Sequence, residues 1–123
     1  MCQVFIGADP ALYQARARSL RLRGVSTSLR LENLFWRVLE EIGARDGLSL
    51  SQLLAKLYDE LTESNGDPGN FTSFLRVSCL RYLSLQLVGA IPHENSVPIA
   101  SLDAIQVLAA ERALHRAASP SRI

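Results

Sequence analysis

Polar and apolar residues alternate along residues 26–31, and this two-residue period is that of a β-strand. In an extended conformation Thr27, Leu29 and Leu31 share one face, where they can cover a core. The other positions share the opposite, exposed face: Ser26, Ser28 and Arg30. The pattern predicts one short strand with an apolar inner face and a polar outer face.

A lone strand leaves its backbone N–H and C=O groups unpaired, so residues 26–31 need a neighbour. No other stretch shows a comparably convincing strand pattern. Pairing with the same strand of a second copy would satisfy both and make an obligate two-fold dimer. The rival is a hairpin within one chain. Residues 19–23 look extended, and the alternation changes phase around Gly24, where a turn or bulge is expected.

Helical periodicity dominates the sequence after this strand. Apolar residues recur at helical spacing over about residues 33–45, and the pair Asp46-Gly47 ends that helix. Ser49 and Gln52 form a capping-box pattern, which opens a second helix with a leucine stripe down to about residue 63. These two helices and the strand are expected to share one core.

Two further helices are expected beyond a turn-rich connector at residues 64–70. The helix over about residues 71–87 is apolar on nearly all sides, so it must be buried on two faces. Arg76 and Arg81 interrupt it and are expected to form ion pairs with acids on neighbouring helices. A last helix runs from residue 101 to about residue 116, with a serine and an aspartate at its start. We find no internal repeat.

The net charge of the 123 residues is only +1, but the charges are unevenly placed. Residues 32–67 hold eight acids against three basic residues. Residues 14–31 hold no acid and five arginines: Arg16, Arg18, Arg21, Arg23 and Arg30. In a dimer two such segments would bring ten positive charges to one surface, which is the charge pattern of a phosphate-binding surface. The alternative is that the arginines only keep an N-terminal arm in solution.

Several segments together resemble the ribbon-helix-helix domain, the DNA-binding fold of the Arc and methionine repressors. They are residues 27–32, the pair Phe35-Trp36, residues 39–42 and residues 46–49. The start of the chain and residues 69–76 are similar to small, largely uncharacterised bacterial ribbon-helix-helix proteins. The resemblance implies a mainly α fold with one short strand. It also implies an intertwined homodimer with an intermolecular two-stranded ribbon, followed by a C-terminal helical extension.

The resemblance also implies a division of the chain and a set of contacts with double-stranded DNA. Residues 1–24 would be a basic N-terminal arm, residues 25–66 the ribbon-helix-helix core, and residues 67–123 a helical extension continuous with that core. The base-contacting residues would be Ser26, Ser28 and Arg30, because a two-stranded ribbon fits the major groove. The phosphate-contacting residues would be Arg16, Arg18, Arg21, Arg23, Ser49 and Ser51.

Other kinds of chemistry are weakly represented. No apolar run approaches the roughly 18 residues of a membrane span, and the first residues do not form a secretory signal. Cys2 and Cys79 match no metal or redox spacing and are expected to be reduced thiols in a cytoplasmic protein. Neither His93 nor His115 has an acid or nucleophile at catalytic spacing. We therefore expect no enzyme activity, no cofactor and no metal.

The sequence thus favours a homodimeric bacterial DNA-binding regulator, a repressor. One alternative is a protein-interaction module of the same fold that has lost DNA contact, and another is an antitoxin. The regulator hypothesis requires that residues 26–31 pair with the same strand of a second copy. It also requires that no part of the protein covers the outward side chains of this strand.

Overall fold

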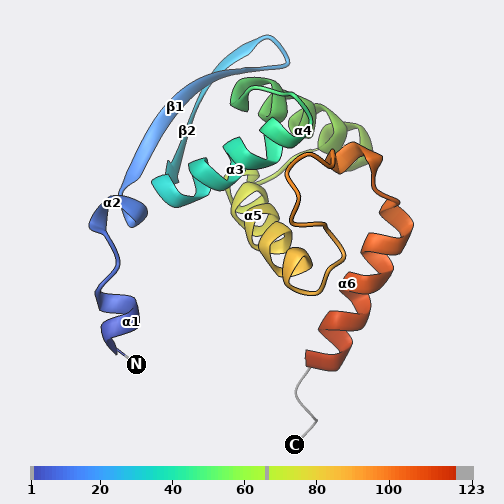
Figure 1. Ribbon diagram of the computed structural model, residues 1–123. Coiled ribbons are helices and arrows are strands. Elements are labelled where there is room, and N and C mark those ends of the chain that lie inside the picture. Colours follow the sequence, from blue (N-terminus) through green and yellow to red (C-terminus); the bar gives the residue numbers. More distant parts are fainter. Residues whose placement is uncertain (1, 66, 119–123) are drawn as a thin grey trace, which may run out of the picture.

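The N-terminal part of the chain forms a ribbon of two antiparallel strands, β1 (Ala15–Leu22) and β2 (Val25–Glu32). In this computed structural model, which describes residues 2–65 and 67–118, these are the strands of the one sheet found among the described residues. Figure 1 shows the ribbon bending over the helices α3 and α4. The register runs from Ala15 opposite Glu32 to Leu22 opposite Val25.

A two-residue turn joins the strands. Arg23 and Gly24 have φ angles of 51° and 80°, so both lie in the left-handed region. Positive φ at both central residues is the geometry of a type I′ turn, whose twist matches that of a hairpin. Glycine adopts this geometry without a steric cost, which is why the turn falls at Gly24.

This hairpin corrects the sequence prediction in one respect. Residues 26–31 do not lack a strand partner in their own chain, because β1 of the same chain pairs with them along their whole length. The rival prediction of an intrachain hairpin is confirmed, and residues 15–22, expected within a basic arm, are a strand. The cause is the turn at Gly24, which brings β1 and β2 of one chain into register. Pairing within one chain avoids the entropy that two separate chains lose when they associate.

The helices follow the predicted order. The bounds of α3 (Asn33–Arg45) and α5 (Phe71–Leu87) agree most closely with the prediction. The helix α4 (Leu50–Asn65) follows α3 and precedes α5 in the chain. The predicted capping box opens α4, since Ser49 N donates to Gln52 Oε1 and Gln52 N donates to Ser49 Oγ. The remaining helical segments are α1 (Cys2–Ile6), α2 (Pro10–Tyr13), η1 (Ile99–Ser101) and α6 (Ala104–Ala118). Gly66, the predicted end of the core, and residues 119–123 lie outside the described residues.

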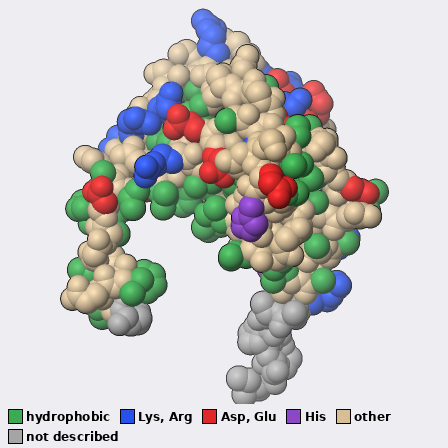
Figure 2. Space-filling model, in the orientation of Figure 1, with side chains coloured by type: hydrophobic (Ala, Val, Ile, Leu, Met, Phe, Trp, Pro, Cys, Tyr) green, Lys and Arg blue, Asp and Glu red, His purple; other side chains and the backbone are tan. Residues whose placement is uncertain are grey.

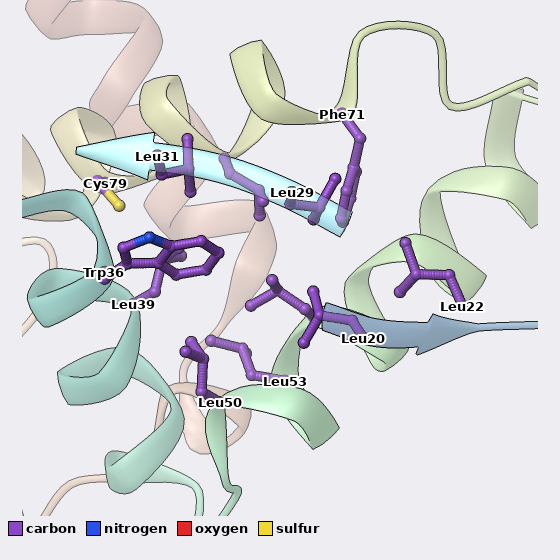
Figure 3. Close-up of a cluster of buried hydrophobic side chains, with 12 residues drawn as sticks. Leu20, Leu22, Leu29, Leu31, Trp36, Leu39, Leu50, Leu53, Phe71 and Cys79 are labelled. Carbon is purple, nitrogen blue, oxygen red and sulfur yellow. The ribbon is translucent and has the colours of Figure 1, made fainter. Parts of the chain in front are cut away.

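The main core lies between the ribbon and the helices α3, α4 and α5 (Figure 3). The ribbon contributes the inward leucines Leu20, Leu22, Leu29 and Leu31. Trp36 of α3 is fully buried beneath them, and its Nε1 donates to Arg16 O at 2.9 Å, which ties α3 to the edge of β1. Burying each such side chain contributes about 1.5–3 kcal/mol relative to leaving it in water. The ribbon is therefore held rigidly on the helices.

Two arginine pairs attach α5 to its surroundings, as predicted, although one of the two acids ends a strand instead of lying on a helix. Arg76 Nε contacts Glu32 Oε1 at 3.0 Å, and Arg81 Nη2 contacts Glu111 Oε1 of α6 at 2.6 Å. The hydrogen bond from Arg76 lowers the pKa of Glu32, and the one from Arg81 lowers the pKa of Glu111. The helix α5 is thus joined to the ribbon on one side and to α6 on the other.

Arg45, at the end of α3, holds the irregular segment that connects α5 to α6. Its side chain is only 5% exposed. The guanidinium donates to four oxygens at 2.8–3.2 Å: Val97 O, Pro92 O, Glu94 O and Tyr82 Oη. The carboxylate of the next residue, Asp46, accepts from Ile99 N and Ala100 N. This role of Arg45 and Asp46 was not predicted, because nothing in the local sequence marks the two residues as bonded to the connecting segment.

Candidate nucleic-acid interface

The outer face of the ribbon is uncovered by protein. Because side chains alternate along each strand, this face takes every second residue, and the register sets these residues opposite one another. The pairs are Ala17 with Arg30, Ser19 with Ser28, and Arg21 with Ser26. All of these residues are exposed. Ser26, Ser28 and Arg30 therefore lie on the outer face, as the alternation predicted.

Two residues of this face were assigned differently or missed. Ser19 was not singled out, and Arg21 was predicted to contact phosphate, yet both share the outer face with Arg30. Both were overlooked because β1 alternates poorly. The inner face of β1 carries Arg16 and Arg18 as well as the buried Leu20 and Leu22, so its polar and apolar residues do not alternate cleanly. The signal that could have found them is the tetrapeptide Ser-Leu-Arg-Leu, which occurs at residues 19–22 and again at residues 28–31.

The ribbon arginines differ in how freely they can bind a ligand. Within the described part of the chain, Arg16 and Arg30 have neither an ion pair nor a side-chain hydrogen bond. Arg21 Nη1 donates to Gly24 O at 2.7 Å, which leaves its other guanidinium donors free. Figure 2 shows Lys and Arg side chains along the top and upper left of the molecule, where the ribbon runs. A cationic surface of this kind attracts phosphate.

The other two basic side chains are engaged by protein. Arg18 lies over the Trp36 ring, with its guanidinium carbon 5.7 Å from the ring centroid. Arg23, in the turn, contacts Asp59 Oδ1 at 3.1 Å and Glu63 Oε1 at 3.8 Å. Both side chains of the nearer pair are about half exposed, so the contact is worth less than about 1 kcal/mol and can be exchanged for a phosphate.

The predicted phosphate contacts on α4 lie at its N-terminus. Ser49 N–H is used in the capping box, whereas Ser51 is exposed in the first turn. The first N–H groups of a helix have no partner within it, and the positive end of the helix dipole favours an anion there. The backbone N–H of the exposed Ser51 is therefore the group at this end that is best placed for a phosphate.

An open hollow of about 450 Å³ lies between α2 and α3, next to the end of the ribbon. Its polar lining includes Arg16, Arg37, Asp9, Asn33 and Glu40. Asn33 Nδ2 donates to Ala11 O at 2.9 Å, while its Oδ1 is buried without a protein donor. The two cations are balanced by two acids, so the hollow is not an anion site in the way that the ribbon face is.

The described residues offer little reactive chemistry. They contain no cluster of three or more His, Cys, Asp or Glu side chains that could hold a metal ion. None of the described helices has the length and apolarity that crossing a membrane requires. Cys79 is buried in the core, and desolvation raises the pKa of its thiol to about 12. The uncovered ribbon face is thus the best-formed candidate site.

A family model described as the ribbon-helix-helix domain matches residues 15–83, which begin at the ribbon and end within α5. The chain belongs to the ribbon-helix-helix family. Ribbon-helix-helix domains generally dimerise and bind DNA, and the family consists typically of DNA-binding transcription regulators and antitoxins.

A solved structure extends this likeness over the whole chain. An uncharacterized protein from Bordetella pertussis Tohama I is 56% identical, with a TM-score of 0.88, over 100% of this chain and 96% of that one. The ribbon-helix-helix part and the helices that follow it therefore recur together in another protein. No curated protein matches this chain.

Proposed function

We propose that this ribbon-helix-helix protein is a bacterial, cytoplasmic transcription regulator, a repressor, that inserts its ribbon into the major groove of duplex DNA. The observation that supports this most directly is the uncovered outer face of the ribbon, where Arg21 and Arg30 are exposed beside three serines. The function was expected to depend on a ribbon formed between two copies, but the hairpin supplies both strands of the ribbon from one chain. A two-stranded ribbon fits the major groove, and a rigid core beneath it fixes the direction of its side chains.

Each polar residue of the face has a chemical role in this proposal. Arg30 can donate two parallel hydrogen bonds to guanine O6 and N7. The hydroxyls of Ser26 and Ser28 can donate to or accept from several base edges. The surrounding cations and the start of α4 would contact phosphates: Arg16, Arg18, Arg21, Arg23, Ser49 and Ser51. The phosphate contacts supply affinity, and the ribbon side chains supply sequence preference.

A homodimer is part of the proposal, although β2 already has its strand partner. The support comes from one side of α5, where apolar residues remain exposed in the single chain. Val77 is 55% exposed, Leu80 56% and Leu87 83%. These residues recur at helical spacing and form an apolar stripe, and such stripes mark protein contacts. We place the contact between two copies on this stripe.

The test is the affinity for fluorescent random-sequence duplexes at increasing salt. Wild type is expected to bind at 50 mM salt, and its affinity should fall steeply toward 200 mM as phosphate contacts release counterions. Arg16→Ala should weaken binding to all sequences and flatten the salt slope by about one unit. Arg112→Ala, an exposed arginine of α6 with the same change in charge, is the matched control and should leave the slope unchanged. Absence of binding at 50 mM salt would contradict the proposal.

The apolar stripe of α5 also favours a second candidate, a protein-interaction module without DNA contact. In that case a partner protein would cover α5, and the ribbon face would stay in water. The two candidates give opposite results in the salt experiment. An antitoxin is less well supported, because the residues after the ribbon-helix-helix part form packed helices, whereas toxin-wrapping segments are disordered before binding.

A further inference from the structure

The two strands of the ribbon carry the same tetrapeptide. Ser-Leu-Arg-Leu occupies residues 19–22 in β1 and residues 28–31 in β2, an offset of nine residues. The prediction that the chain has no internal repeat missed this short one. The register sets Ser19 opposite Ser28, near the middle of the ladder.

An antiparallel ladder has a local two-fold axis through each such pair, perpendicular to the ribbon. The axis through Ser19 and Ser28 exchanges the strands and carries residues 16–22 of β1 onto residues 25–31 of β2, nine positions later. It therefore carries Arg21 onto Arg30, and each leucine of the first tetrapeptide onto a leucine of the second. The sequence repeat and the geometry of the ladder are thus related by one operation.

The burial of the side chains follows the same symmetry. The inward leucines Leu20 and Leu22 are 5% and 4% exposed, and their symmetry mates Leu29 and Leu31 are 8% and 0% exposed. Arg21 and Arg30 both point outward and are exposed. Two copies of one strand, related by a molecular dyad, would give this arrangement, but here both strands belong to a single chain.

We infer that the ribbon of one chain contacts an inverted-repeat DNA site, with Arg21 and Arg30 as equivalent base-contacting residues on either side of the dyad. This inference rests on the proposed function and reassigns Arg21 from phosphate to base. Each arginine takes one guanine, and the two guanines lie on opposite DNA strands, because a dyad perpendicular to the ribbon also exchanges the strands of the duplex.

The register also sets the spacing of the two guanines. Arg21 stands opposite Ser26 and Arg30 opposite Ala17, four ladder positions apart. At about 3.3 Å per residue this is about 13 Å along the ribbon, which spans at most about four base pairs. The symmetry is broken at the residues directly opposite the arginines. The mate of Ala17 is Ser26, so one flank of the site meets a methyl group and the other a hydroxyl.

The test begins with selection of wild-type binding sites from a pool of random duplexes. The expected product is an inverted repeat with a guanine on each strand, at most about four base pairs apart. On a duplex with both guanines, Arg21→Ala and Arg30→Ala are each expected to raise the Kd by about 10- to 100-fold and to agree within about threefold. Arg21→Lys keeps the charge, so the salt dependence should be unchanged, while loss of the planar guanidinium fork should weaken the preference for guanine. Arg112→Ala again serves as the control.

A duplex with one guanine replaced gives the sharpest outcome. Wild type, Arg21→Ala and Arg30→Ala should bind it about equally, because the ribbon can turn about its dyad and present either arginine to the remaining guanine. If wild type binds no duplex, the proposed function itself fails. If wild type binds but selects an asymmetric site, or if Arg21→Ala binds the two-guanine duplex as tightly as Arg112→Ala does, the symmetric assignment fails while DNA binding stands.

Discussion

Single residues decide how the helical half is joined to the ribbon half. Arg45 is the clearest case, because it is a buried cation that contacts no carboxylate among the described residues and is surrounded by carbonyl and hydroxyl oxygens. One of them, the Tyr82 hydroxyl, in turn donates to Glu41 Oε2 at 2.6 Å. Desolvation, and then the hydrogen bond to Glu41, raises the pKa of Tyr82. A charge in such a cage is stabilised only while every donor keeps its acceptor.

Replacing Arg45 by Met should lower the free energy of unfolding by about 3 kcal/mol, because it leaves the buried Tyr82 hydroxyl and three part-buried carbonyl oxygens without this donor. Urea unfolding, followed by the fluorescence of Trp36, measures the change. Arg37→Met, an exposed position on the same helix, should change the free energy by less than about 0.5 kcal/mol. A loss below about 1 kcal/mol for Arg45→Met would mean that the cage does not hold the connector.

At the scale of elements, the main helices were predicted closely, while the sheet was predicted only in part. The bounds of α3 and α5 follow from apolar spacing and from local stop signals, such as Gly47, whose φ is 69°. Residues 15–18 of β1 were missed because Arg16 and Arg18 interrupt its alternation, whereas residues 19–22 were predicted to be extended. The choice between pairing within the chain and pairing between copies was left open, because no local pattern encodes it. The outer residues of β2 were predicted, since they needed only its own period of two.

The attachment of α6 depends on pH. Glu111 has a pKa lowered from 4.5, first by the hydrogen bond from Arg81, and His115 Nε2 lies 3.8 Å from the same carboxylate. A carboxyl group whose pKa falls on folding stabilises the fold above its ordinary pKa and loses that contribution as the pH falls through the lowered value. The stability should therefore be constant from pH 7 to about pH 5 and decline below pH 4.5.

Glu111→Gln should reduce the unfolding free energy at pH 7 by no more than about 1 kcal/mol, because Arg81 is 40% exposed and solvent screens the pair. As the pH falls through the lowered pKa of Glu111, the difference in stability between the variant and wild type should disappear. Glu60→Gln, an exposed carboxylate on α4, is the control and should run parallel to wild type across the range. A pH profile of Glu111→Gln that also runs parallel to wild type would show that the pair contributes nothing.

At the scale of the whole molecule, apolar surface remains uncovered in a single chain. Figure 2 shows apolar side chains along the lower edge of the body and on α1, which lies apart from it. Val4, Phe5 and Ile6 of α1 are 77%, 70% and 76% exposed. Together with the apolar stripe of α5, these side chains form apolar surface outside the ribbon, so DNA bound to the ribbon face would not cover it.

Sedimentation equilibrium should show a homodimer of the wild-type chain at micromolar concentration. Leu80→Gln should weaken it at least tenfold, because this leucine is 56% exposed in the single chain and would be buried between two copies. Leu34→Gln, at a residue of α3 that is 47% exposed, should leave the association unchanged. A monomer up to about 100 micromolar would contradict the homodimer, and equal effects of both variants would move the contact away from α5.

The joining of both strands by the turn at Gly24 has a consequence for how such a protein diverges. In an assembly of identical copies, one codon change alters both halves of the recognition surface at once. Here the halves are encoded separately, so a mutation at Arg21 leaves Arg30 unchanged. Mutations can then change the base preference of one half of the ribbon at a time and favour DNA sites without symmetry. A ribbon formed by two identical chains cannot change in this way.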